Sequence, residues 1–326
     1  MKALQIQAYG GPEVVEVIDI ETPEPGPGQV LVKAHTFGLG YPDVLLRTGV
    51  YKWKPSLPSI LGNEMSGHIE ALGTGVTGLE IGQPVLVFGT GGGRHAEYNA
   101  VDTALVTPLP ESVDMEAAVS IPNYLVAWAI LHDVARADDV KTIYVNGAAG
   151  GTGTAILDMC RDAGIAAIAG ASTDEKCAFA VKLGALGTVN YSTENIVEKV
   201  REITDGRGVD LSFDQLGGPD LVKNLDMLAP MGLVVLYNAL AGAPDEDLFD
   251  GLRARRGLSL GVQCFSLHVY DEQPGRLAAI FDALVQKFAA GAYAPPVFDR
   301  LPLSEARRAH ELMGERAILG KLLLKP

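Results

Sequence analysis

The sequence predicts an α/β protein in which a doubly wound parallel sheet is joined to a β-rich domain. Three observations support this expectation. Glycine and proline interrupt the first ~120 residues so often that only short β-branched runs remain between the turns. After Asp114, longer apolar patterns of helical period begin, and beyond them strand-like and helical runs alternate. The length of 326 residues fits about two domains.

The first part of the chain offers short strands, such as Val30–Val32 and Pro84–Phe88. The stretch at 115–137 is the first with the length and period of helices. Near the other end, we expect a helix at Gln273–Ala290 and a strand at Gly320–Lys325 that packs back on the first part. We therefore expect one domain at residues 1–122, completed by 271–326, and a second at 123–270.

The second domain shows the alternation most clearly. Strands are expected at Thr142–Asn146, Ile165–Ala171, Thr188–Asn190, Val209–Asp214, Leu233–Asn238 and Leu258–Gln263. Helices are expected between them at Thr154–Ala163, Asp174–Leu183, Ile196–Ile203, Pro219–Leu228 and Asp245–Arg255. Six strands joined by five helical crossovers predict a doubly wound parallel sheet.

Charge and composition limit the function. With 26 basic and 40 acidic residues the net charge is −14, the wrong sign for steering toward nucleic acid or an anionic membrane. No apolar stretch has the length of a membrane span, and Met1–Gly10 lacks the apolar core of a signal peptide. We therefore expect a cytoplasmic protein without membrane or nucleic-acid contact.

Cysteine and histidine spacing argues against a metal site. Cys160, Cys177 and Cys264 lie far apart and outside any CxxC pair. The six histidines form no HxxxH pair and have no cysteine at ligand spacing. We expect no bound metal and no disulfide framework.

The strongest motif is a glycine-rich turn between a strand and an amphipathic helix, with glycines at 147, 150, 151 and 153. Such glycines permit a tight turn and close approach of the backbone to a pyrophosphate, which the helix amides then bind. The pattern is a GxxGGxG variant, because Ile156 stands where GxGxxG needs its third glycine. The alternative is a glycine-rich turn without a ligand, but the surrounding alternation favours dinucleotide binding.

The end of the second strand of this domain favours NADPH over NADH. An acidic residue there would accept both ribose hydroxyls of NADH, yet residues 170–173 carry no carboxylate. Lys176 follows closely, and a cation with hydroxyl donors suits a 2′-phosphate. Alternatively, Asp174 and Lys176 only begin a helix, with Asp174 as a first-turn acid.

At this point the chain resembles the zinc-free, zeta-crystallin-like quinone oxidoreductases of the medium-chain dehydrogenase/reductase superfamily, over nearly its whole length. The resemblance lies in Gly38-Leu-Gly-Tyr-Pro-Asp43, Arg47-Thr-Gly-Val-Tyr51, Leu61-Gly-Asn-Glu-Met-Ser-Gly67, Ala148-Ala-Gly-Gly-Thr-Gly153, Asp174-Glu-Lys176, Asn190-Tyr191, Phe213-Asp-Gln-Leu-Gly-Gly218 and Gly320-Lys-Leu-Leu-Leu. It implies a GroES-like β-rich domain, completed by the C-terminal tail, plus a Rossmann domain, with the active site in the cleft between them. It also implies homodimers that join their Rossmann sheets edge to edge through Leu258–Gln263.

The same resemblance implies residues that bind the cofactor. The 2′-phosphate would be bound by Ser172, Lys176 and Tyr191. The pyrophosphate would be bound by Gly150, Gly151, Thr152 and Gly153, and the nicotinamide would meet the backbone of Asn238, Ala239 and Leu240. Zinc-dependent relatives carry a histidine where this chain has Asn63, and the four-cysteine structural lobe is absent, so the resemblance also implies no zinc.

Departures from the family leave few polar candidates for catalysis. Gly40, Leu45 and Val126 stand where family quinone reductases commonly carry Asn, Tyr and Thr, and Asp158 replaces the usual Gln. The remaining catalytic candidates are Tyr41, Asp43, Tyr51 and Asn63. Tyr51 is the preferred hydrogen-bond donor. Alternatively, Tyr41 and Tyr51 are packing aromatics, and Asp43 caps a helix that starts at Val44.

Three functions are compatible with these residues. Without a Lewis acid, electron-poor acceptors fit better than ordinary ketones, which favours an NADPH:quinone oxidoreductase with a quinone or conjugated carbonyl substrate. An NADPH-dependent enal or enone double-bond reductase is the second. The third is a nucleotide-binding protein with an RNA-binding or structural role, which the acidic charge disfavours.

Overall fold

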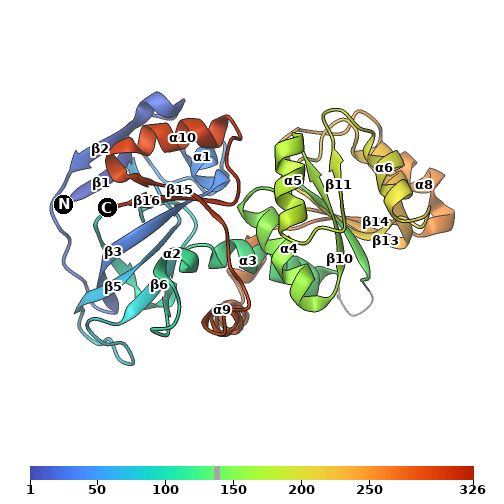
Figure 1. Cartoon of the computed structure of the whole chain (residues 1–326). Coiled ribbons are helices and arrows are strands. Elements are labelled where there is room, and N and C mark those ends of the chain that lie inside the picture. The colour runs from blue at the N-terminus through green and yellow to red at the C-terminus, as the bar shows by residue number, and fades with distance from the viewer. Residues whose placement is uncertain (136–139) are drawn as a thin grey trace. The chain divides into compact units, whose positions relative to one another are not determined.

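The computed structural model describes residues 1–135 and 140–326, which form two compact units (Figure 1). One unit comprises Met1–Pro122 with Ala278–Pro326, and the other comprises Asn123–Leu277. Both junctions fall inside helices, the first in α3 (Ile121–Trp128) and the second in α9 (Pro274–Ala289). The second junction therefore lies seven residues beyond the position 270 expected from the sequence.

The unit Asn123–Leu277 contains a six-stranded sheet in the order β11-β10-β9-β12-β13-β14, with every neighbouring pair parallel. Its strands are β9 (Thr142–Asn146), β10 (Ala166–Ala171), β11 (Gly187–Asn190), β12 (Val209–Asp214), β13 (Leu228–Leu236) and β14 (Gly261–Cys264). This confirms the predicted doubly wound parallel sheet. The strand order reverses between β9 and β12, and such sheets bind ligands beyond the carboxyl ends of the strands at that point.

Helices join these strands, and polar caps start several of them. They are α4 (Gly151–Ala163), α5 (Asp174–Lys182), α6 (Ile196–Ile203), α7 (Leu221–Asn224) and α8 (Leu248–Ala254). The Thr173 side chain accepts a hydrogen bond from Lys176 N at the start of α5, and Asn195 accepts one from Glu198 N at the start of α6. Gly164 ends α4 in the left-handed conformation at φ 69°.

Several predicted elements in this unit differ in extent from those observed, among them the strand expected at Leu233–Asn238, which is β13 at Leu228–Leu236. The helix expected at Pro219–Leu228 is the short α7 followed by a 3₁₀ turn, because Leu228 pairs with Val209 and so belongs to β13. The helix expected from Asp245 begins only at Leu248. The strand expected at Leu258–Gln263 is β14, which begins at Gly261 because Ser259 turns the chain at φ 54°.

The other unit is built on two sheets, a three-stranded one in the order β2-β1-β4 and a seven-stranded one. The strands are β1 (Lys2–Ile6), β2 (Val15–Asp19), β3 (Gln29–Leu39), β4 (Ser59–Ile60), β5 (Glu64–Leu72), β6 (Pro84–Phe88), β7 (Tyr98–Asp102), β8 (Val106–Pro108), β15 (Val297–Pro302) and β16 (Lys321–Lys325). The C-terminal β16 lies antiparallel to β3, so the end of the chain completes the larger sheet.

The helices of this unit are few and short. They are α1 (Tyr41–Thr48), α2 (Met115–Ala118) and α10 (Ala306–Gly314), together with parts of α3 and α9. The helical stretch expected at 115–137 is interrupted at 119–120 and ends in a π-helical segment at Ala129–Val134, while residues 136 and 137 lie outside the described part. Within residues 1–135 and 140–326, no helix combines the length and apolar character needed to cross a membrane.

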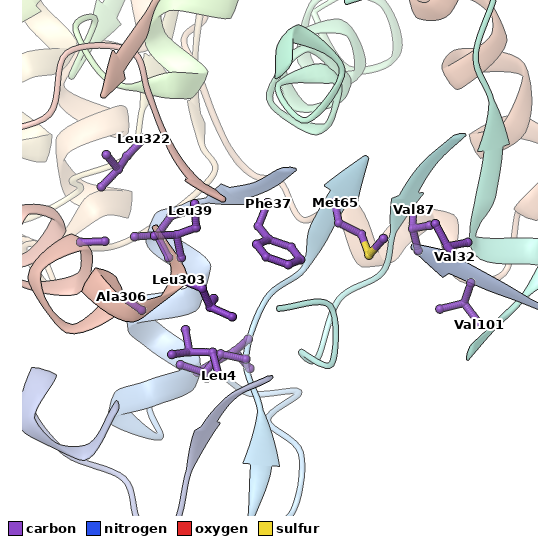
Figure 2. Close-up of a cluster of buried hydrophobic side chains, with 14 of the residues drawn as sticks. Leu4, Val32, Phe37, Leu39, Met65, Val87, Val101, Leu303, Ala306 and Leu322 are labelled. Atoms are coloured by element: carbon purple, nitrogen blue, oxygen red, sulfur yellow. The ribbon is translucent and has the colours of Figure 1, made fainter. Parts of the chain in front are cut away.

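The core of this unit gathers side chains from strands far apart in the sequence (Figure 2). Phe37 of β3 and Met65 of β5 are fully buried, as is Leu322 of β16. Leu303, which lies before α10, and Ala306, its first residue, belong to the same cluster. Burial of each large apolar side chain contributes about 1.5–3 kcal/mol, so this cluster fixes the C-terminal tail against the N-terminal strands.

Candidate functional site

The glycine loop after β9 needs glycine at two positions for its own shape. Gly147 has φ 74°, and a Cβ atom there would lie 1.7 Å from Nε2 of Gln215. A Cβ on Gly153 would lie 2.4 Å from the carbonyl oxygen of Gly147. Glycine at these positions therefore lets the turn close and lets α4 pack directly on the loop.

Gly150 keeps the start of α4 open, whereas a Cβ on Gly151 would lie 3.2 Å from Asn123 Oδ1. A Cβ on Gly150 would meet nothing closer than 3.6 Å, and Gly150 precedes α4 without giving it a side-chain cap. The first amides of a helix without such a cap, together with the helix dipole, suit an anion. The loop and the following Gly151, Thr152 and Gly153 therefore fit a pyrophosphate group.

Side chains from α3 hold this helix in place. Asn123 Nδ2 donates to Thr152 Oγ1 at 3.1 Å. The hydroxyl of Tyr124 donates to Asp158 Oδ2 at 2.7 Å, and Asp158 also forms an ion pair with Arg161. Asp158, which stands where the family usually has Gln, thus fastens α4 to α3.

The predicted 2′-phosphate residues lie at the ends of two neighbouring strands. Ser172 follows β10, and Lys176 Nζ in the first turn of α5 donates to Ser172 Oγ at 3.2 Å. Tyr191 follows β11, and its backbone N–H donates to the carbonyl oxygen of Ala171 at 3.0 Å. The structure thus brings a cation and a hydroxyl together beside Tyr191, and this donor set suits a phosphate dianion.

One acid near this cluster has a partner that sequence reasoning missed. The carboxylate of Asp174 accepts a hydrogen bond from Asn190 Nδ2 at 2.7 Å. Asn190 ends β11, where it pairs with Ala171 of β10. The sequence offered one indication of this role: Asn190 stands directly before Tyr191 in one of the motifs that carry the family resemblance.

The predicted nicotinamide segment lies in the loop after β13, which ends at Leu236 rather than at Asn238 as expected. The amide of Leu240 donates to the carbonyl oxygen of Gln215 at 3.2 Å, and that of Ala239 donates to Asn238 Oδ1 at 3.3 Å. The backbone bond of Leu240 therefore ties the segment to the loop that follows β12, and the Ala239 bond stays within the segment.

A buried carboxyl group organises the adjoining strand ends. Asp214 Oδ1, at the end of β12, accepts hydrogen bonds from the amide of Leu216 at 2.8 Å and from Asn146 Nδ2 at 3.2 Å. Burial raises the pKa of Asp214 above its usual value, although these hydrogen bonds oppose the shift. The ends of β9 and β12 are thereby joined where the strand order reverses.

In the other unit, Asp43 sits in the first turn of α1. This helix begins at Tyr41, so the alternative in which Asp43 caps a helix that starts at Val44 was wrong about the start but right that Asp43 serves as a cap. Asp43 Oδ2 accepts a hydrogen bond from the amide of Gly40 at 2.8 Å, which is the return bond of a capping box. Asp43 is only 1% exposed, and burial raises its pKa to about 6, while the nearby charge of Lys321 opposes the rise.

Beside Asp43 lies a buried ion pair that the sequence analysis did not assign. Lys321 of β16 binds Glu64 of β5, and both side chains are almost fully buried. Gly38 of β3 makes room for them, because a Cβ there would lie 2.8 Å from both Glu64 Oε1 and Lys321 Cε. His95 Nε2 lies 3.2 Å from the carbonyl oxygen of Gly38, and burial lowers the pKa of His95 to about 4, so the ring is neutral.

The other catalytic candidates also lie in this unit. Asn63 is buried, and its Oδ1 accepts a hydrogen bond from the amide of Gly92 at 3.1 Å. Tyr51 packs against the core of this unit, with its ring centroid 5.6 Å from that of Trp53. Tyr41 is partly exposed at the first position of α1. In the part of the chain that the structure describes, no three His, Cys, Asp or Glu side chains gather as metal ligands.

Two family models match the chain. The alcohol dehydrogenase GroES-like domain matches residues 26–111, and the zinc-binding dehydrogenase model matches residues 151–273. Each match falls within one of the two units described above, the first in the β-rich unit and the second in the unit with the parallel sheet.

Known proteins are similar over the full length. A quinone oxidoreductase of Pseudomonas aeruginosa is 33% identical over 327 residues, which cover 100% of this chain and 99% of the relative. A 2-haloacrylate reductase of a Burkholderia species is 30% identical over 336 residues, covering 99% and 98%. The crystal structure of Escherichia coli quinone oxidoreductase complexed with NADPH aligns with a TM-score of 0.91 at 28% identity, covering 100% of both chains. The chain therefore belongs to the quinone oxidoreductase family of the medium-chain dehydrogenase/reductase superfamily.

Proposed function

We propose that this protein is an NADPH-dependent oxidoreductase that reduces quinones by hydride transfer without zinc. Its membership of the family makes it an oxidoreductase that acts on a small molecule. The observation that carries the cofactor assignment is the open glycine loop together with the Lys176–Ser172 hydrogen bond. The Escherichia coli relative, which was crystallised with NADPH, supports the same assignment.

The proposed binding residues are those that the family resemblance implies, and the glycine loop and the Lys176–Ser172 hydrogen bond support them. The pyrophosphate would be bound by the amides of Gly150, Gly151, Thr152 and Gly153. Ser172, Lys176 and Tyr191 would bind the 2′-phosphate, and the backbone of Asn238, Ala239 and Leu240 would orient the nicotinamide. NADPH, when bound, supplies a hydride from C4 of the nicotinamide.

In the other unit, Tyr51 is our candidate to donate a hydrogen bond to the oxygen on which negative charge develops. Asp43 and Asn63 hold the backbone of Gly40 and Gly92, so they act as positioning residues. Tyr41 is the second candidate donor. The hydroxyl group of a tyrosine suits this task because it both donates and has a high ordinary pKa.

The proposal that the reaction needs no zinc rests on the side chain at position 63. Asn63, at the position where zinc-dependent relatives carry histidine, uses its side-chain oxygen to bind the amide of Gly92. We expect elemental analysis of the purified protein to find no stoichiometric zinc, and chelation to leave the activity unchanged. Stoichiometric zinc together with inactivation by chelators would contradict this part of the proposal.

A screen with NADPH against 1,2-quinones, 1,4-quinones, enals and enones tests the reaction. We expect the highest kcat/KM with a quinone. The second candidate is an enal or enone double-bond reductase, which the 2-haloacrylate reductase relative favours because haloacrylate carries a conjugated C=C bond. Turnover of enones but not quinones would select that alternative, and absence of turnover with every acceptor would refute both.

We also propose a homodimer that joins the sheets through β14, and a cytoplasmic location. Among residues 1–135 and 140–326, β14 pairs with β13 alone, so its other edge has no partner strand there. Light scattering at micromolar concentration should give twice the mass of the 34.4 kDa chain. A monomer at all concentrations would rule out this assembly.

A further inference from the structure

Asn190 connects two acidic side chains at the edge of the proposed 2′-phosphate site. Its side chain is only 8% exposed, and Nδ2 donates to Asp174 Oδ1 at 2.7 Å. Its backbone N–H donates to Glu194 Oε2 at 2.7 Å, and its own Oδ1 accepts from the amide of Ser192 at 3.2 Å. This one residue therefore fixes the direction of both carboxylates.

Asp174 is the carboxylate that matters for the choice of cofactor. It is the first acid after β10 and begins α5, two residues beyond Ser172 and two before Lys176. A carboxylate near this strand end can accept hydrogen bonds from both ribose hydroxyls of NADH, whereas a 2′-phosphate is repelled by it. The hydrogen bond to Asn190 instead ties the Asp174 side chain to the end of β11.

We infer that Asn190 is a specificity-determining positioning residue, which holds the Asp174 carboxylate on β11 and so keeps the Ser172–Lys176 pair selective for a 2′-phosphate. This inference rests on the proposed NADPH function and adds a residue that does not itself touch the phosphate. Selectivity at this site then depends on a carboxylate being held aside as well as on a cation being present.

Asn190 also has a purely structural role, which predicts a different result. Its side-chain Oδ1 accepts from the amide of Ser192 at 3.2 Å and so helps to shape the turn after β11. The backbone carbonyl of Asn190, which a side-chain substitution leaves in place, accepts from the amides of Thr193 and Glu194 in the same turn. Loss of this role would lower stability and weaken NADPH and NADH equally. Removal of the Asp174 charge would not repair such damage, and this separates the two roles.

The experiment is a double-mutant cycle on cofactor affinity. The dissociation constants of NADPH and NADH are measured by calorimetry for the parent, Asn190→Ala, Asp174→Asn and the double variant. We expect Asn190→Ala to weaken NADPH about tenfold, as for loss of one charge-assisted contact, while NADH binds as well as before or better. Asp174→Asn should leave NADPH within about twofold of the parent, and the double variant should return to that level.

A gentler variant keeps the test valid if Asn190→Ala unfolds the turn. In Asn190→Ser the hydroxyl can still accept from the amide of Ser192, but the side chain is one atom shorter and lacks the Nδ2 amide that donates to Asp174. Unchanged selectivity in both variants of Asn190, or a double variant as weak as Asn190→Ala, would overturn the inference alone. Equal affinity of the parent for NADPH and NADH would instead refute the proposed cofactor, so the two failures are distinguishable.

Discussion

The buried carboxyl group of Asp43 should make the stability of the protein depend on pH in a direction opposite to that of most acids. Burial raises its pKa from 3.8 to about 6, and the residue is 1% exposed. Each pKa unit corresponds to about 1.4 kcal/mol, so the ionised form costs about 3 kcal/mol in the folded state at neutral pH. Because the folded chain takes up the proton first, stability is gained as the pH falls below 6, and the gain is complete below 3.8.

Asp43→Asn removes this titration and retains an oxygen that can accept from the amide of Gly40. The stability of the variant minus that of the parent should therefore fall by about 2 kcal/mol between pH 7.5 and 4.5, which is the part of the total that this range covers. His95 and His310 are buried with the pKa lowered to about 4 and about 3, so both proteins lose stability in acid by the same amount. That contribution cancels in the difference.

Urea denaturation followed by tryptophan fluorescence and circular dichroism at several pH values measures the difference. Asp19→Asn, which alters an exposed carboxylate of the same unit, is measured beside it as the matched control. If the Asp43→Asn difference varies by less than about 0.5 kcal/mol over this range, or no more than the control difference, the burial argument is wrong.

Three further substitutions test the proposed site and the core. Lys176→Ala should weaken NADPH binding tenfold or more and leave the affinity for NADH nearly unchanged in calorimetry, since it removes one charge-assisted contact. Equal weakening of both cofactors would contradict the 2′-phosphate assignment. Tyr51→Phe should lower kcat and kcat/KM together by roughly 10- to 1,000-fold with NADPH affinity intact, and an unchanged kcat would shift the role to Tyr41. Lys321→Met should destabilise the protein by about 3–5 kcal/mol in urea denaturation, because it leaves Glu64 buried without its partner. Adding Glu64→Gln to this variant should recover part of the lost stability. If Lys321→Met costs less than about 1 kcal/mol, the ion pair is dispensable for stability.

The parallel sheet could be predicted because each strand is specified by a short local run of apolar residues. β9 and β12 were expected with the observed bounds, since their β-branched and aromatic residues are followed by turns. The ends of later elements depended on distant contacts instead. Leu228, for example, follows a helix-like pattern but is drawn into β13 by its pairing with Val209.

The polar partners within the candidate site were less accessible to sequence reasoning. Glu64 and Lys321 are 257 positions apart, and they meet because β3 pairs with both β16 and β5. The bond between Asp174 and Asn190 spans 16 positions and depends on the parallel register of β10 with β11. Spacing along the chain carries no signal for such contacts, whereas the glycine loop is contained in seven consecutive residues and could be recognised directly.

The structure also separates the four catalytic candidates by what their side chains can donate. An ionised carboxylate only accepts hydrogen bonds, and Asp43 Oδ2 already accepts one from Gly40. The side-chain oxygen of Asn63 accepts a hydrogen bond from the amide of Gly92, and this bond fixes the orientation of the Asn63 side chain. A developing oxyanion needs a donor: the two tyrosines offer a hydroxyl group and Asn63 offers its Nδ2 amide, whereas an ionised Asp43 offers none. Tyr51 is tied to the end of α1 through its backbone N–H, which donates to the carbonyl oxygen of Leu45 at 3.1 Å, so the helix that Asp43 caps also positions the proposed donor.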